Sequence, residues 1–131
     1  PNLELNIHTH EYQPIPLDKV GDELRHSSIV LVLTNPNTKG MMTTKFYEAF
    51  GCEKPVLCTP SDNGLLAQTI RQTNAGLASS DINEIKEFII EKYREWQQNG
   101  YTRQAVINKE QFSREKQAQQ FEQLFLQCIQ Q

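Results

Sequence analysis

The chain contains 131 residues, a length that suits one domain able to bury about two thirds of its unfolded surface. The formal net charge is −3, and Lys and Arg are scattered, which argues against an overall basic field for nucleic acid or anionic lipid. No stretch approaches the roughly 18 consecutive apolar residues of a membrane span. We therefore expect a cytoplasmic protein, with peripheral membrane contact only through parts outside this chain.

Cysteine usage indicates a reducing compartment. The three cysteines, Cys52, Cys58 and Cys128, are odd in number and lack C-x-x-C spacing, which disfavours a disulfide framework or a zinc knuckle. Because Cys58 lies in an apolar run and Cys128 in an apolar helical stripe, we expect both thiols to be small core groups. The first residue is Pro1 rather than Met, so we expect the working protein to be longer.

The first half of the chain predicts alternating strands and helices. Residues 3–9 alternate like a strand, and a helix opened by Pro16 is expected from Leu17 to about His26. The run 29–33 is continuously apolar and largely β-branched. This pattern predicts a strand that is buried on both faces in the middle of a parallel sheet.

The central segments continue this alternation. A helix is expected across 43–50, ended by Gly51 in the left-handed conformation, and 55–58 predicts a short buried strand. A further helix spans 64–74 and a short strand spans 76–78. The residues expected on the inward face of the first of these two elements are Leu65, Leu66, Thr69 and Ile70.

Two amphipathic helices close the sequence. Asp81 and Glu84 form a capping box before a helix that ends near Asn99 and Gly100. Its apolar stripe consists of Ile82, Ile85, Phe88, Ile89, Tyr93 and Trp96. The last helix is capped by Ser113. Its apolar face carries Ala118, Phe121, Leu124, Phe125 and Cys128, opposite a Gln-rich face.

This order of elements is typical of a right-handed parallel α/β sheet. We therefore predict a single α/β domain over residues 1–131. It should contain a Rossmann-like parallel sheet of about four strands, with helices on both faces, and a helical C-terminal tail over 101–131.

The most distinctive candidate site is the loop that leads into the helix at 43–50. Ligands of open parallel sheets bind beyond the carboxyl ends of the strands. The first-turn amides, the hydroxyls of Thr43 and Thr44 and the helix dipole favour an anion, and Lys45 could add a charge-assisted contact. Glu48 follows Thr44 by one turn, where a carboxylate could accept two ribose hydroxyls. An ordinary N-cap followed by a solvated glutamate explains the same residue types.

The loop after the strand at 55–58 is a weaker candidate. Its residues Ser61, Asp62, Asn63 and Gly64 precede the next helix, and their amides could contact phosphate or sugar hydroxyls. A turn followed by an N-cap explains these residues equally well.

Neither a metal site nor covalent catalysis is predicted. His8 and His10 share one face of the first predicted strand, with Glu11 nearby, but two ligands without a third at suitable spacing do not make a metal site. His26 ends a helix, where a cation is favourable. No Ser/His/Asp or Cys/His arrangement has a supporting motif.

Four segments in succession resemble the donor-binding C-terminal domain of the retaining, glycogen-synthase-like GT-B glycosyltransferases. They are SSIVLVLTNPNTKG, TTKFYEAFGCEKPVLCTP, LLAQTIRQTNAGLAS and FSREKQAQQFEQLF, and the likeness covers roughly residues 25–127. It implies the nucleotide-sugar-binding part of a hexosyltransferase of polysaccharide biosynthesis, which moves a sugar from an NDP-sugar to a glycan or lipid-linked acceptor. It implies no metal or other cofactor, and no turnover by this chain alone.

The resemblance also implies roles for matching positions. Glu48 matches the second acidic residue of the family's E-x(7)-E pattern, which binds the ribose. The first acidic residue, which contacts the donor sugar, would fall at Gly40, so the pattern is broken there. Thr43 and Thr44 match the helix start near the diphosphate, and many relatives have a Lys at the position of Lys45. The family's Arg/Lys pair and its N-terminal acceptor domain, a further implied partner, cannot be placed in this chain.

Two other classes remain as alternatives. A receiver-like signalling domain also has a Thr at a strand end and a Lys-Pro pair, as at Thr34, Lys54 and Pro55. However, the predicted strands end without the acidic cluster and phospho-accepting Asp of that fold, and Lys54-Pro55 precedes a strand instead of following one. A sugar-nucleotide epimerase shares the GT-B architecture but needs catalytic carboxylates and a His that we cannot identify.

Overall fold

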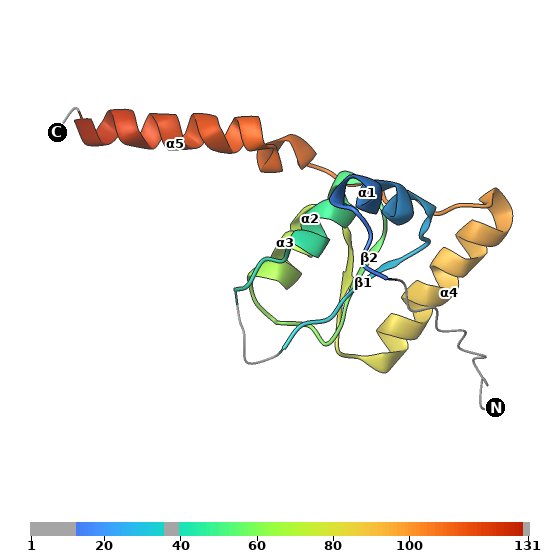
Figure 1. Cartoon of the computed structure of the whole chain (residues 1–131). Coiled ribbons are helices and arrows are strands. Elements are labelled where there is room, and N and C mark those ends of the chain that lie inside the picture. Colours follow the sequence, from blue (N-terminus) through green and yellow to red (C-terminus); the bar gives the residue numbers. More distant parts are fainter. Residues whose placement is uncertain (1–12, 36–39, 130–131) are drawn as a thin grey trace.

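The computed structural model describes residues 13–35 and 40–129 and is an α/β fold (Figure 1). In chain order, its elements are α1 (Leu17–His26), β1 (Val30–Val32), α2 (Thr44–Gly51), β2 (Val56–Cys58), α3 (Leu65–Gln72), β3 (Gly76–Ala78), α4 (Ile82–Asn99), the 3-10 helix η1 (Lys109–Phe112) and α5 (Arg114–Ile129). The predicted strand at 3–9, with His8, His10 and Glu11, lies outside the described residues. None of the helices in the described ranges is long and apolar enough to cross a membrane.

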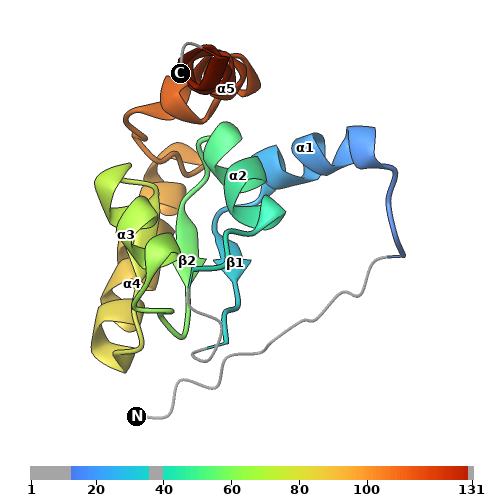
Figure 2. The same ribbon diagram turned by 90° about the vertical axis from the view of Figure 1, so that its left-hand side faces the viewer.

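The sheet is parallel, as predicted, with strand order β1-β2-β3. Val56 of β2 lies opposite Val30 of β1 on one side and Gly76 of β3 on the other. The described sheet has three strands instead of about four. α2 and α3 lie on one side of the strands and α4 on the other (Figures 1 and 2). The predicted class and the placement of helices on both faces are therefore confirmed.

The central strand is β2 and not β1. All three residues of β2 are buried, whereas in β1 only Val32 is buried and Leu31 is 51% exposed. Leu33, which follows β1, is 71% exposed. The prediction that 29–33 is buried on both faces is therefore wrong for the described sheet. An apolar run fits a half-covered edge strand as well as a central one, and strand order depends on long-range pairing.

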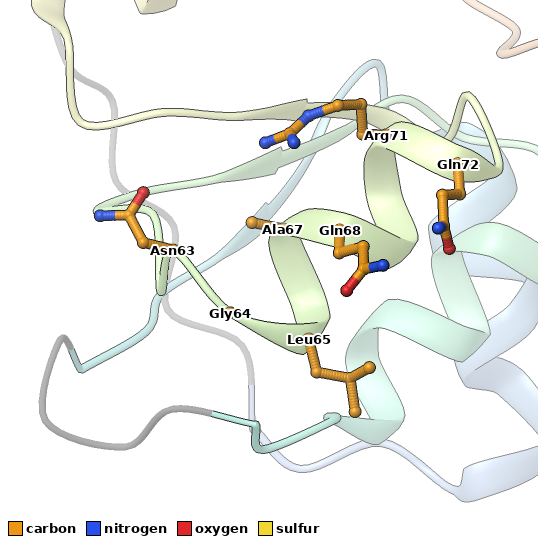
Figure 3. A pocket seen from close by; sticks show the side chains of 7 residues that line it. All are labelled: Asn63, Gly64, Leu65, Ala67, Gln68, Arg71 and Gln72. Carbon is orange, nitrogen blue, oxygen red and sulfur yellow. The ribbon is translucent and has the colours of Figure 1, made fainter.

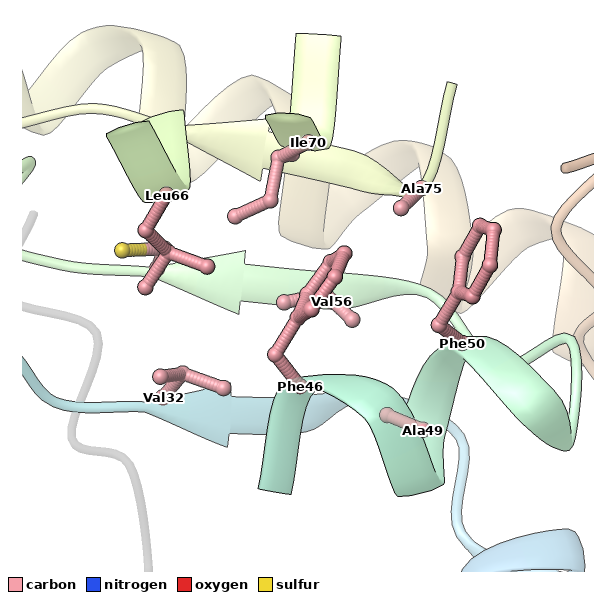
Figure 4. Close-up of a cluster of buried hydrophobic side chains, with 9 residues drawn as sticks. Val32, Phe46, Ala49, Phe50, Val56, Leu66, Ile70 and Ala75 are labelled. Atoms are coloured by element: carbon pink, nitrogen blue, oxygen red, sulfur yellow. The ribbon is translucent and has the colours of Figure 1, made fainter. Parts of the chain in front are cut away.

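One apolar core holds α2 and α3 against the sheet (Figure 4). Phe46 has no exposed surface, and its ring stacks on that of Phe50 with centroids 5.5 Å apart. Phe112 of η1 packs edge-on against Phe50, which ties the end of the fold to α2. The buried cluster comprises Val32, Phe46, Ala49, Phe50, Val56, Cys58, Leu66, Ile70 and Ala75. Cys58 is thus a core thiol, as predicted, and burial raises its pKa.

Two expectations about α3 and α4 need correction. Leu65 is 48% exposed, because the inward face of α3 is formed by Leu66, Ala67, Thr69 and Ile70. The Asp81 side chain accepts from the amides of Asn83 and Glu84, as expected of a cap. The Glu84 carboxylate, however, accepts a hydrogen bond from the Ser79 hydroxyl. Ser79 Oγ in turn accepts a hydrogen bond from the Asp81 amide at 3.0 Å. Ser79 therefore replaces the second half of the capping box.

The apolar stripes of α4 and α5 remain largely exposed. Lys92 is the buried residue of α4, and its ammonium lies 3.2 Å from Glu95. None of the described residues of α5 is buried, and this helix extends away from the rest of the fold (Figure 1). Cys128 on α5 is exposed, so the prediction of a core thiol there is wrong. An amphipathic pattern shows that a helix has an apolar face but not that the face is covered.

The end of α2 also differs from the prediction. Gly51 is the last residue of the helix, Cys52 is its cap, and the left-handed conformation falls on Glu53, with φ of 55°. The Glu53 carboxylate accepts from Arg103 Nε at 2.7 Å and lies 3.4 Å from Lys109 Nζ. The hydrogen bond from Arg103, followed by that from Lys109, lowers the pKa of Glu53. Ionic contacts with Arg103 and Lys109 thus stabilise Glu53 in a backbone conformation that glycine would adopt without strain.

We expect Glu53→Gly to be more stable than Glu53→Ala by about 1 kcal/mol in urea denaturation, because both lose the ion pairs but only glycine tolerates positive φ without strain. Since the pKa of Glu53 is lowered from 4.5, the ion pairs stabilise the wild type above that pH. This stabilisation is lost as pH falls through the folded-state pKa, so the advantage of wild type over Glu53→Gly should shrink in acid. If Glu53→Gly and Glu53→Ala are equally stable, this explanation is contradicted.

Candidate functional site

The candidate site lies where the carboxyl ends of the three parallel strands meet the starts of the following helices. β1, β2 and β3 lead into Thr34, Thr59 and Ser79, respectively. The Thr34 hydroxyl donates to the Pro60 carbonyl, and the Ser61 amide donates to Ser80 Oγ at 2.9 Å. These bonds tie neighbouring loops together at one edge of the sheet. The predicted site residues that the structure describes belong to this edge, to the starts of α2 and α3 or, for Glu48, to the second turn of α2.

The start of α2 presents hydrogen-bond donors to solvent. Thr43 is the N-cap, as expected, and its side chain accepts from the Phe46 amide at 3.3 Å. Within the described ranges, the amides of Thr44 and Lys45 have no acceptor, and both residues are exposed. The start of a helix with free N–H groups carries partial positive charge. The geometry of α2 therefore suits an anion.

Glu48 lies on the outer part of α2 and is half-buried. Phe46, Ala49 and Phe50 occupy the face that packs on the core, so the Glu48 carboxylate is not drawn into it. No other described residue forms a hydrogen bond or ion pair with this side chain. Since positions four apart share a helix face, Glu48 and Thr44 face the same side of α2.

The loops before α2 and α3, which the sequence presents as separate candidates, meet at two glycines. Gly40 has φ of 85°, and a Cβ on Gly64 would stand 3.4 Å from the Gly40 nitrogen. The same Cβ would lie only 2.9 Å from Asp62 Oδ2. A side chain at Gly64 would therefore crowd both loops. This contact makes the two candidate loops one continuous surface.

The start of α3 is occupied by the carboxylate of Asp62. This side chain is 3% exposed. Its two oxygens accept from the amides of Leu66 at 3.2 Å and Ala67 at 2.9 Å. The Asn63 amide is also used within the loop, because it donates to Ser61 Oγ at 3.2 Å. The chain supplies its own anion at α3, so α2 is the better place for an external one.

We expect Asp62→Ala to lower the free energy of unfolding by about 1–2 kcal/mol, because it removes the carboxylate that accepts from two buried amides in the first turn of α3. Asp62→Asn, which keeps one carbonyl oxygen, should fall between alanine and wild type. The exposed Asp18 in the first turn of α1 provides the control, and Asp18→Ala should change stability by less than about 0.5 kcal/mol. Urea denaturation followed by circular dichroism measures all three. Equal effects of Asp62→Ala and Asp18→Ala would contradict the capping role.

A groove of 670 Å³ runs along the outer side of α3 (Figure 3). It begins at Asn63 and Gly64 and continues to Arg71 and Gln72 in the last turn of the helix. The remaining lining residues are Leu65, Ala67 and Gln68. Asn63 and Gly64 are among the residues predicted from the sequence, whereas Arg71 and Gln68 are not. Their helical spacing from Gly64 was the available signal, because positions three, four and seven apart share a helix face.

The histidines do not form a site in the described part of the chain. His8 and His10 lie outside it, and the ring Nδ1 of His26 is 2.7 Å from the carbonyl oxygen of Asp22. Among the described residues, no group of three or more His, Cys, Asp or Glu side chains could hold a metal ion.

Comparisons of the chain with family models, with curated proteins and with solved structures found no match. The case for a function therefore depends on the residues and geometry of this chain.

Proposed function

We propose that this chain is the nucleotide-sugar-binding part of a GT-B glycosyltransferase that transfers a hexosyl group from an NDP-sugar to a glycan or lipid-linked acceptor. The observation that carries the proposal is the start of α2. There, the free amides of Thr44 and Lys45 lie one helical turn from Glu48, whose carboxylate has no partner among the described residues. The free amides suit the diphosphate of a donor, and the carboxylate one turn further along suits the hydroxyls of its ribose.

The diphosphate would bind at the first turn of α2. The amides, the helix dipole and the Lys45 ammonium would balance its negative charge, which also stabilises the leaving group during transfer. The Thr43 oxygen caps the helix and holds this turn in place. Around Gly40, the space that a side chain would occupy is open, so the backbone there leaves room for the phosphates.

Glu48 would accept hydrogen bonds from both ribose hydroxyls. A carboxylate is acceptor-only and has lone pairs for two neighbouring donors, which matches a vicinal diol. Gly40 stands where the resemblance expects the acidic residue that contacts the donor sugar, so other residues must hold the sugar here. The resemblance places the acceptor site in a separate N-terminal domain. We therefore expect this chain to bind nucleotide without turning it over.

A receiver-like domain fits the structure less well. That alternative requires an acidic cluster at the strand ends, but β1 is followed by Leu33 and Thr34, β2 by Thr59 and β3 by Ser79. Of the described acidic residues next to this edge, Asp62 is buried and accepts from the amides at the start of α3, and Asp81 caps α4 by accepting from the amides of Asn83 and Glu84. Asp62 is therefore unavailable as a phosphate acceptor.

Titration calorimetry with UDP, GDP and ADP, each with and without its sugar, tests the proposed function. At least one NDP should bind the wild-type chain, and Glu48→Ala should weaken that binding about tenfold or more, since hydrogen bonds to a charged group contribute about 1.5–3 kcal/mol. Glu87→Ala removes an exposed carboxylate on α4 and should leave the affinity unchanged. The proposal fails if no NDP binds or if the two variants behave alike.

A further inference from the structure

We infer that the groove along α3 binds an acidic saccharide, a hydroxylated sugar ring that carries a carboxylate or a phosphate. The groove has a volume of 670 Å³, within the range of about 300–1,000 Å³ that is typical of small-molecule sites. It lies beyond the predicted diphosphate position, and its chemistry differs from that of the α2 start.

The acidic group is indicated by Arg71. This side chain is exposed in the last turn of α3 and makes no hydrogen bond or ion pair with another described residue. A guanidinium presents paired N–H groups that match the two oxygens of a carboxylate or phosphate. Among the described residues that line the groove, none is acidic, so none of them competes with a ligand for Arg71.

The sugar hydroxyls are indicated by three side-chain amides that line the same groove, those of Asn63, Gln68 and Gln72. None of the three side chains is bonded to another described residue. Each amide offers both a donor and an acceptor, which is what successive hydroxyls on a ring require. Leu65, which is 48% exposed at one end, provides an apolar contact for the C–H face of a ring.

The floor of the groove is hollow because its residues are small. Ala67 is almost fully buried, and Gly64 has no side chain. In Figure 3, the Asn63 amide and the Arg71 guanidinium lie on the same side of α3 as the small side chain of Ala67, which leaves space in the groove. A large side chain at position 67 would fill this space.

The groove also connects with the proposed donor site. It begins at Gly64, which packs against the backbone of Gly40, three residues before the N-cap of α2. A sugar attached to a diphosphate at α2, or an acceptor that approaches it, could therefore reach Arg71. That the saccharide is a donor or acceptor in the transfer reaction rests on the proposed function. That the groove binds an acidic saccharide does not.

Binding of trigalacturonate, with maltotriose as the neutral counterpart, tests the groove directly without nucleotide. UDP-glucuronate and UDP-glucose, compared with UDP alone, test whether the acidic sugar arrives on the donor. We expect at least one acidic compound to bind at least tenfold more tightly than its neutral counterpart and to shift the amide NMR signals of α3. Arg71→Gln should abolish this preference, Arg71→Lys should keep part of it, and Arg94→Gln on the exposed side of α4 should leave it intact.

Each outcome decides the inference. A preference for trigalacturonate that depends on Arg71 identifies an acidic acceptor, and one confined to UDP-glucuronate identifies an acidic donor; both support the groove. Equal affinity for acidic and neutral compounds, no binding of either, or a preference that survives Arg71→Gln overturns it. A failure of the proposed function can be told apart from a failure of the groove, because Glu48→Ala should weaken binding of whichever NDP the chain takes, while Arg71→Gln should leave that NDP affinity unchanged.

Discussion

Gly76→Ala is expected to lower the free energy of unfolding by about 3–5 kcal/mol, the sum of overpacking against a fixed neighbour and backbone strain. Gly76 begins β3 and pairs with Val56 of the central strand. A Cβ at this position would stand 2.0 Å from the Val56 carbonyl oxygen and 2.7 Å from its nitrogen. Because the atoms in the way belong to the backbone of the sheet, the clash cannot be relieved by rotating a side chain. The φ of 150° adds strain that only glycine avoids.

Gly51→Ala is the matched control for this experiment. No atom lies within 4 Å of the position that its Cβ would take, and Gly51 is helical. Alanine should therefore stabilise the protein by up to about 1 kcal/mol. Urea denaturation followed by circular dichroism should move the two midpoints in opposite directions. A Gly76→Ala variant as stable as wild type would mean that β2 and β3 do not pair in this register.

The second large effect is expected for Phe46→Ala, which should cost about 3–5 kcal/mol. The Phe46 side chain is fully buried between α2 and the sheet. It stacks on Phe50 and meets Tyr47 edge-on with centroids 5.3 Å apart. The cavity left by alanine would loosen the packing of α2, so nucleotide affinity should fall together with stability even though Phe46 does not line the site.

Phe121→Ala provides the same chemical change on α5, where the side chain is 62% exposed. We expect it to alter stability by less than about 0.5 kcal/mol. Thermal denaturation of both variants, with nucleotide titration of each, distinguishes the core from the exposed helix. Comparable losses in the two variants would show that α5 is packed in solution and that its apolar face is covered.

Much of the local structure follows from neighbouring residues. Pro16 opens α1, Thr43 and Asp81 cap α2 and α4, and Gly100 ends α4 with φ of 76°. These features depend on backbone preferences and hydrogen bonds within a few residues. The alternation of strands and helices likewise indicates a parallel α/β sheet.

Strand order and burial of the helix faces depend on contacts far apart in the sequence. The apolar run at 29–33 is longer than the segment 55–58, yet β2 from the shorter segment is central because it pairs with both other strands. Glu53 takes the left-handed conformation that Gly51 was expected to adopt, held by contacts with Arg103 and Lys109. The stripe of α5 looks like a core face in the sequence, but whether a face is covered depends on tertiary neighbours.

At the candidate site, too, some features follow from the local sequence and others depend on tertiary contacts. The sequence by itself determined that Thr43, Thr44, Lys45 and Glu48 share the start of one helix, because helical spacing alone places them there. Only the tertiary structure decided that Gly40 packs against Gly64 and that the Thr34 hydroxyl donates to the Pro60 carbonyl, which together join the loops that precede α2 and α3. The physical reason is that loop contacts between adjacent parallel strands join residues more than twenty positions apart, which no local pattern encodes.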